Sequence, residues 1–258
     1  MASSIDSLLQ IMARLRGPQG CPWDREQTLE TLRTFLLEEA HEVLEAMQGD
    51  EREALREELG DLLFQIVFQA RIAEELGWFD FESVAAAIAD KLIRRHPHVF
   101  GEDRLDTASE VAVQWEELKE RERRASADPS RLKGVPRSLP GLLRALRLSQ
   151  KAAHAGFEWP TTAEVFDKVR EEIGEWESAR TAGDREAASR ELGDLLFSLV
   201  NVARKEGLDP EAALQGSNDR FQRRFRDMER MMADAGETAE SLSLQRWDEL
   251  WREAKARE

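Results

Sequence analysis

Apolar residues recur every three or four positions through most of the chain, which is the spacing of one face of an α-helix. One such row in the first half consists of Leu32, Leu36, Ala40, Val43 and Met47. Matching rows in the second half start at Val165 and at Leu192. Further helices are expected near residues 82–95, 107–124, 142–153, 211–234 and 243–256. Because no segment shows the two-residue alternation of a half-buried strand, the pattern predicts an all-α protein.

Short turns separate the paired helices of each half. They fall at Gly49-Asp50 in the first half and at Gly183-Asp184 in the second. Glycine and aspartate favour turns, and two helices joined by so short a connection run antiparallel. Each half is therefore expected to contain a helical hairpin.

One segment of the chain occurs twice. The letters ELGDLLF stand at residues 58–64 and again at 191–197, and an acidic motif precedes each at the same distance, EEAHE at 38–42 and EEIGE at 171–175. The shared pattern E-E-x-x-E-x15-E-x-x-D predicts a duplicated unit. Prolines and glycines interrupt any helix within residues 125–141, where we expect a linker. The predicted domains are residues 1–124 and 142–258.

The composition indicates which binding partners and which cellular compartment suit the chain. The net charge is −15, and an acidic chain repels phosphate backbones, so stable nucleic-acid binding is not expected. A bound divalent metal would still allow a phosphate ligand to bind. The single cysteine, Cys21, permits no disulfide within the chain, and no stretch approaches the ~20 apolar residues of a membrane span. These features predict a cytoplasmic protein that does not enter the membrane.

The repeated acids are candidates for metal binding. Glu172 and Glu175 share one face of a helix because residues three apart are neighbours, and Glu191 and Asp194 do so on the next helix. Antiparallel packing would bring both pairs together, and a divalent cation would remove their repulsion. Oxygen-only ligands favour Mg²⁺, with Mn²⁺ also possible. The matching acids of the first copy are Glu39, Glu42, Glu58 and Asp61.

The acids allow two other interpretations. A single E-x-x-E is often a solvated helix face, but both copies of this chain keep the same acids, which favours a metal site. A di-iron carboxylate bundle would need E-x-x-H pairs. Glu38 and His41 form one such pair, whereas Gly174 stands at the matching position in the second copy. The nitrogen ligands of a di-iron site are therefore lacking.

A phosphate ligand would need basic partners, since the chain has no GxxxxGK[ST] loop. Lys168 lies one turn before Glu172, and Arg190 adjoins Glu191. A later helix adds Asn218, Arg220 and Arg224. Among the aromatic residues Trp251 is the candidate for stacking on a base. The first copy has fewer polar groups for a substrate, so the second copy is the better candidate for an active site.

With these residues the chain resembles the MazG family of nucleoside triphosphate pyrophosphohydrolases. The resemblance runs along nearly the whole length. Besides the acidic motif in both copies, it includes CPWD at 21–24, RRHPHVF at 94–100, GVP at 134–136, KAAHAGFEW at 151–159 and RRFR at 223–226.

The resemblance implies tandem four-helix-bundle-like units of the all-α NTP pyrophosphatase type, a homodimer, and hydrolysis of NTPs and dNTPs to the monophosphate and pyrophosphate. It also implies that the C-terminal copy is catalytic and the N-terminal copy structural or weakly active. By that match the magnesium ligands are Glu172, Glu175, Glu191 and Asp194. The nucleotide site is lined by Lys168, Glu171, Arg190, Arg220, Arg224 and Trp251.

The expected mechanism is attack of water on the α-phosphorus with pyrophosphate as leaving group. Metal ions would neutralise the triphosphate and lower the pKa of a bound water, and Glu171 would orient or deprotonate that water. Two rival classes are a non-catalytic nucleotide-binding or dimeric scaffold protein, and a hydrolase that cuts at the γ-phosphate. A thermal shift on adding magnesium and nucleotide separates the expected enzyme from the first rival, and the product separates it from the second.

Overall fold

The computed structural model describes residues 3–47, 49, 51–101, 104–107, 109–111, 113–115, 118 and 130–257. Every regular element in these ranges is a helix, so the predicted all-α fold is confirmed for the described part of the chain. The chain divides into two compact units, residues 1–119 and 120–258. Each unit is described by itself.

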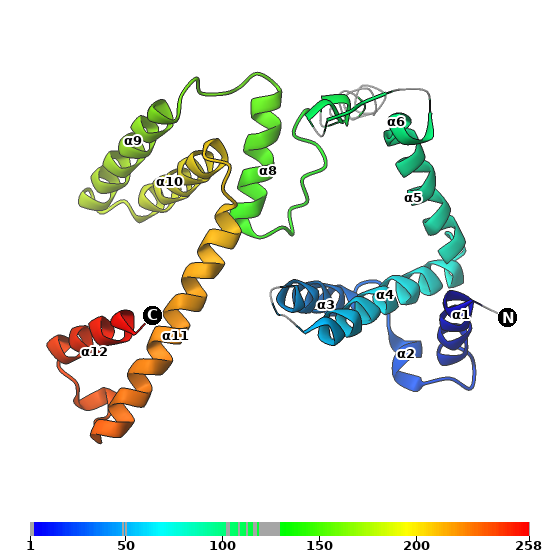
Figure 1. The fold of residues 1–258 in the computed structure, drawn as a ribbon, viewed down its shortest axis with the longest axis horizontal. Helices are drawn as coiled ribbons and strands as arrows, with labels where there is room; N and C mark the ends of the chain where they lie inside the picture. The colour runs from blue at the N-terminus through cyan, green and yellow to red at the C-terminus, as the bar shows by residue number, and fades with distance from the viewer. Residues whose placement is uncertain are drawn as a thin grey trace. The chain divides into compact units, whose positions relative to one another are not determined.

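Six helices of the first unit are described over their whole length. They are α1 (Ser4–Leu15), α2 (Pro22–Glu26), α3 (Leu32–Ala46), α4 (Arg52–Glu75), α5 (Phe81–Arg95) and α6 (Pro97–Phe100). Helices α3 and α4 lie side by side as a hairpin, and α1 packs against α4 (Figure 1). The core between α1, α3 and α4 is formed by Met12, Leu32, Val67, Phe68 and Ile72.

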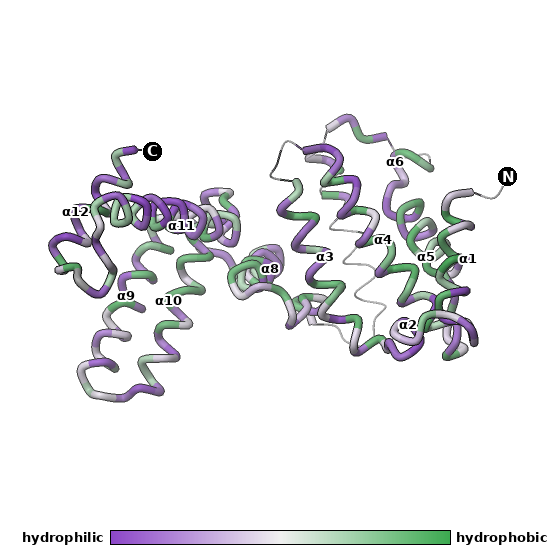
Figure 2. The backbone as a smooth tube through the Cα atoms, turned by 90° about the horizontal axis from the view of Figure 1, so that it is seen from below, coloured by the Kyte–Doolittle hydropathy of each residue, from purple (hydrophilic) through white to green (hydrophobic). Residues whose placement is uncertain are grey.

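The second unit contains five α-helices and one short 3-10 helix among its described residues. They are α8 (Gly141–His154), α9 (Thr162–Thr181), α10 (Arg185–Lys205), α11 (Pro210–Ala235), the 3-10 helix η1 (Ala239–Ser241) and α12 (Leu244–Ala256). Helices α9 and α10 form a hairpin, α8 packs against α10, and α12 packs against α11. Figure 2 shows hydrophobic and hydrophilic residues alternating along these helices, as the sequence pattern predicts.

The turn of the α9–α10 hairpin follows from its sequence. Gly183 adopts a positive φ of 73°, which costs glycine little because it has no side chain. The next residue, Asp184, caps α10, because its carboxylate accepts a hydrogen bond from the backbone N–H of Ala187 at 2.9 Å. Glycine and aspartate therefore act together to reverse the chain between the two helices.

The predicted helices agree with the described ones to within about two residues, the usual uncertainty of helix ends. The helix predicted over 107–124 is described only in part, and residues 109–111, 113–115 and 118 of it are helical. Residues 125–129 of the predicted linker and Asp50 of the first predicted turn lie outside the described residues. No helix of the described chain is both long and apolar enough to cross a membrane.

Candidate metal and nucleotide site

Three acids of the second unit meet in the α9–α10 hairpin. Glu172 and Glu175 on α9 and Glu191 on α10 each place a carboxylate oxygen within 4.8 Å of the others. Glu172 is only 4% exposed, whereas Glu175 faces solvent. A group of oxygens this close together suits a hard divalent cation.

The helix periodicity explains the burial of Glu172. Val165 and Val169 are buried, and Glu172 follows them at the same helical spacing. The apolar face that packs α9 onto α10 therefore ends in a carboxylate. A buried carboxylate needs a partner of opposite charge or a metal, because desolvation of the charge is costly.

Lys168 supplies positive charge to this cluster. Its Nζ lies 2.7 Å from Glu172 Oε1 and 2.9 Å from Glu171 Oε1. These two contacts raise the pKa of Lys168 above its ordinary value, with Glu172 as the larger cause. The pKa of Glu175 is also raised, first by desolvation of its carboxyl and then by the charge of Glu172. The cluster therefore keeps an excess of negative charge.

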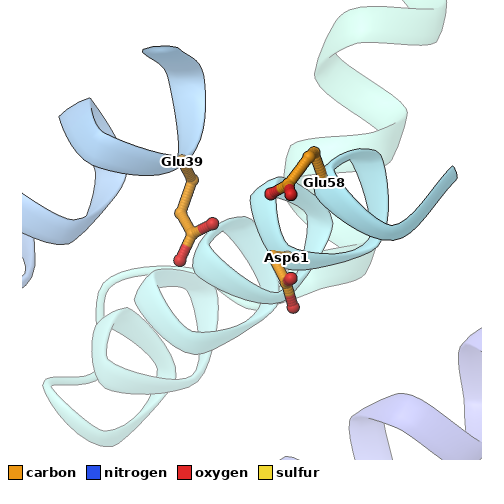
Figure 3. Close-up of side chains that lie close together, drawn as sticks. All are labelled: Glu39, Glu58 and Asp61. Atoms are coloured by element: carbon orange, nitrogen blue, oxygen red, sulfur yellow. The ribbon is translucent and has the colours of Figure 1, made fainter. Parts of the chain in front are cut away.

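The first unit has a cluster at the matching position. Glu39 on α3 points toward Glu58 and Asp61 on α4 (Figure 3), and these three side chains also bring oxygens within 4.8 Å of one another. Burial raises the pKa of Glu39, and the charges of Asp61 and Glu42 raise it further. The pKa of Glu58 is raised by desolvation and by Glu42.

Each cluster gathers three of the four predicted ligands. In the second unit the exposed Asp194 lies outside the group of three. In the first unit the exposed Glu42 lies outside it. The two clusters differ in which acid is left out. All four positions of the motif therefore take part in at least one cluster.

The predicted substrate residues are spread over several elements. Lys168 is in the cluster, whereas the Arg190 guanidinium binds Glu186 at 3.0 Å and is exposed. Asn218, Arg220 and Arg224 lie on α11 and Trp251 lies on α12. Figure 1 shows α12 beside the far end of α11, away from the α9–α10 hairpin. These four residues are thus carried by helices other than the α9–α10 hairpin that holds the acids.

Trp251 lines an aromatic groove between α11 and α12. The Arg224 guanidinium lies 5.4 Å from the ring centroid of Trp251, and Phe221 lies 5.5 Å from it. The groove is completed by Phe225, Met228, Leu244, Gln245, Trp247 and Asp248. Flat apolar walls with a guanidinium at the edge suit a planar ring that carries phosphate.

Sequence reasoning missed three contributors to these sites. Phe221 and Phe225 line the groove. They lie one helical turn apart, as Trp247 and Trp251 do, and this shared spacing was the available signal. Gln65 lies in the first cluster, four residues after Asp61 and hence on the same helix face. Its side-chain amide approaches Glu39 closely enough to oppose the rise in the pKa of that acid.

Comparison of the sequence with models of protein families identifies the class of this all-α chain. A model of the MazG nucleotide pyrophosphohydrolase domain matches residues 27–100, and a model of phosphoribosyl-ATP pyrophosphohydrolase matches residues 141–220. Both matched ranges contain an acid cluster. The class is therefore that of pyrophosphohydrolases, in two tandem units.

Similar proteins cover nearly the whole chain. The nucleoside triphosphate pyrophosphohydrolase of Escherichia coli (strain K12) is 47% identical, over 99% of this chain and 98% of that protein. The nucleoside triphosphate pyrophosphohydrolase/pyrophosphatase MazG of Thermotoga maritima is 40% identical, over 97% of this chain and 95% of that protein. The chain belongs to the MazG family, and it is a hydrolase of phosphoric anhydride bonds.

Proposed function

We propose that the second unit catalyses Mg²⁺-dependent hydrolysis of NTPs and dNTPs to the monophosphate and pyrophosphate. The observation that carries this proposal is the convergence of Glu172, Glu175 and Glu191 around one point, with Lys168 beside them. The family membership supports the same chemistry.

The donor set fits a magnesium ion. All the converging atoms are carboxylate oxygens, which hard cations prefer, and no histidine or cysteine belongs to the group. When bound, the ion would neutralise triphosphate charge and supply an activated water. Mn²⁺ has similar ligand preferences and would substitute.

The neighbouring residues have separate roles in the proposed reaction. Glu171 is exposed, so its carboxylate is accessible to a water, and its Oε1 lies 2.9 Å from the Nζ of Lys168. Glu171 would take the proton of the water that attacks the α-phosphorus. The Lys168 ammonium would move from Glu172 to the phosphate oxygens, where its charge would stabilise the leaving pyrophosphate.

The nucleoside would be held by the α11–α12 groove. Trp251 would stack on the base, Arg224 and Arg220 would bind phosphate oxygens, and Asn218 and Arg190 would add polar contacts. Apart from Arg190, these residues lie on other helices than the acids, and a second copy of the chain would complete the site. A homodimer is supported by an apolar row on α10 that stays exposed, Leu192, Leu196 and Leu199.

Product analysis tests the proposal. A panel of NTPs and dNTPs would be incubated with Mg²⁺ or with EDTA, and products separated by anion-exchange chromatography. We expect monophosphate and pyrophosphate with Mg²⁺ only. Glu172→Ala should lower kcat on the order of 1,000-fold, because the site loses a charge that acts in the transition state. Glu177→Ala, an exposed acid of α9 outside the cluster, serves as the control.

The first unit serves as an internal comparison. We propose that it is mainly structural, so Glu39→Ala and Asp61→Ala should leave most of the turnover. We propose that residues 125–141 are the linker. Near wild-type rates in Glu172→Ala would contradict the assignment of the active site. Nucleotide binding without turnover would instead indicate the non-catalytic or scaffold alternative, and release of phosphate would indicate cleavage at the γ-phosphate.

A further inference from the structure

Lys168 supplies the positive charge of the second acid cluster. Its Nζ lies 2.7 Å from Oε1 of Glu172, whose side chain is only 5% exposed, and 2.9 Å from Oε1 of Glu171. No other lysine or arginine among the described residues pairs with Glu172, Glu175 or Glu191. The position of this one ammonium group therefore decides how much negative charge the cluster offers to a ligand.

The fold of the hairpin does not require a lysine at this position. The Lys168 side chain is 35% exposed, so it is not part of the packed core. In the repeat the matching residue is Phe35 of α3, which packs against the core of α1, α3 and α4. A hairpin with the same acidic motif thus forms with an apolar side chain there. The charge at residue 168 belongs to the site rather than to the fold.

The ammonium group and a divalent cation would compete for the same acids. Both are attracted to the buried carboxylate of Glu172, and two positive charges at close range repel each other strongly where water is largely excluded. Lysine carries its charge on a flexible stem, so the ammonium of Lys168 can leave Glu172 when another anion is within reach. The oxygens of a triphosphate are such an anion.

We propose that Lys168 couples the binding of the divalent cation to the binding of the triphosphate. Without nucleotide, the ammonium group lowers the affinity of the acids for a free cation. A triphosphate draws the ammonium to its own oxygens, and the acids then bind the cation more tightly. This inference rests on the proposed function and adds regulation to it, because the second unit takes the metal–nucleotide complex in preference to the free metal.

Mn²⁺ binding by full-length variants tests the coupling. The background variant carries Glu58→Gln and Asp61→Asn, which neutralise two acids of the first cluster, so that the titration reports the second cluster. Mn²⁺ would be added without nucleotide, and the free ion would be followed by electron paramagnetic resonance. Adding Lys168→Met should tighten Mn²⁺ binding by about 10-fold, because the competing charge is lost. Methionine is also a strong helix former, so α9 should be kept.

Turnover by the Lys168→Met chain gives the second measurement. In the presence of saturating Mg²⁺, the KM for nucleotide should rise by about 10-fold or more, because the triphosphate loses a charged partner. Tighter Mn²⁺ binding and weaker nucleotide binding in one variant are opposite changes. A lysine that only supported the fold would weaken both when it is removed.

Two control variants separate the charge of Lys168 from other effects. Lys168→Arg keeps the positive charge, so its Mn²⁺ affinity should stay near that of the background variant. Arg170→Met removes a positive charge from the exposed side of α9, where Arg170 pairs with Asp167, and it should change neither Mn²⁺ affinity nor KM. Circular dichroism and thermal unfolding in EDTA would verify that each variant folds.

Three results would overturn the proposal. They are unchanged or weaker Mn²⁺ binding by Lys168→Met, equally tightened binding by Lys168→Arg, and equally tightened binding by Arg170→Met. The proposed function fails on a different result, which is a wild-type chain that releases no pyrophosphate with Mg²⁺. The Mn²⁺ titration contains no nucleotide, so the two failures are distinguishable.

Discussion

At the scale of single residues, a group of charges holds the segment between α8 and α9. Arg204, whose side chain is 11% exposed, binds Glu158 through two guanidinium nitrogens, one of them at 2.8 Å from Oε1. Lys205 Nζ also lies 3.2 Å from Glu158 Oε1 and donates to the carbonyl of Trp159. This group fixes the start of α9, and with it the position of Glu172 relative to α10.

The pH dependence of this group is a testable consequence. The hydrogen bonds from Arg204 lower the pKa of Glu158 to about 2 from an ordinary value of 4.5. A lowered pKa stabilises the fold above pH 4.5, and this contribution is lost as the pH falls from 4.5 toward 2. Glu158→Gln should therefore lower the free energy of unfolding by about 1–2 kcal/mol at pH 7, after allowance for solvent screening.

Urea unfolding at several pH values measures this effect. The difference between wild type and Glu158→Gln should shrink as the pH approaches 2. Asp167→Asn breaks the exposed pair with Arg170 and should change stability by less than about 1 kcal/mol. A difference for Glu158→Gln that stays constant down to pH 2 would contradict the assigned cause.

At the scale of elements, the two hairpins position the acids. Each hairpin combines an acidic face on one helix with an acidic face on the next, and the turn sets the register between them. In the second unit this register depends on Gly183 in the left-handed conformation and on the cap from Asp184. The clustering of acids is therefore a property of the helix pair, and neither helix has it alone.

Two glycine substitutions separate the effect of backbone conformation on stability from the effect of added side-chain volume. Gly183→Ala should lower the free energy of unfolding by about 1–2 kcal/mol, because alanine is strained at a positive φ. Gly174→Ala lies inside α9 with no atom near the added carbon, and it should raise stability by about 0.5–1 kcal/mol. Both would be measured from urea unfolding midpoints of the metal-free protein. Equal effects of the two substitutions would show that the turn conformation is not the cause.

At the scale of the whole molecule, many apolar side chains remain exposed. The α9–α10 hairpin buries Val165, Val169 and Val200, yet Leu192, Leu196 and Leu199 on the same hairpin are each close to half exposed. Two helices have too few facing side chains to bury both of their apolar rows. A second copy that covers this row would supply the missing core and would bring a second set of side chains to the acids.

Oligomeric state provides the corresponding measurement. The wild-type chain should sediment as a dimer at micromolar concentration. Leu196→Glu should weaken dimerisation on the order of 100-fold, because it places a charge in the apolar interface. Leu208→Glu, at an exposed apolar position between α10 and α11, should leave the dimer unchanged. A wild-type monomer, or a dimer that tolerates Leu196→Glu, would contradict this interface.

The candidate site was only partly predictable from the sequence. The motif placed Glu172 and Glu175 on one helix face, and the structure brings both next to Glu191. It did not indicate that Asp194 stays outside this group or that Gln65 turns inward in the first unit. Those outcomes depend on how two helices cross and which rotamers they allow, and helical periodicity carries no such information.

The sequence by itself determined the helices, the duplication and the family, because a helix is set by hydrogen bonds and side-chain contacts between residues three or four apart. Only the tertiary structure decided which carboxylates converge, that Lys168 pairs with the buried Glu172, and that Trp251 lies on a groove separate from the acids. These contacts join residues distant along the chain, and their distances follow from packing between helices rather than from the pattern within any one of them.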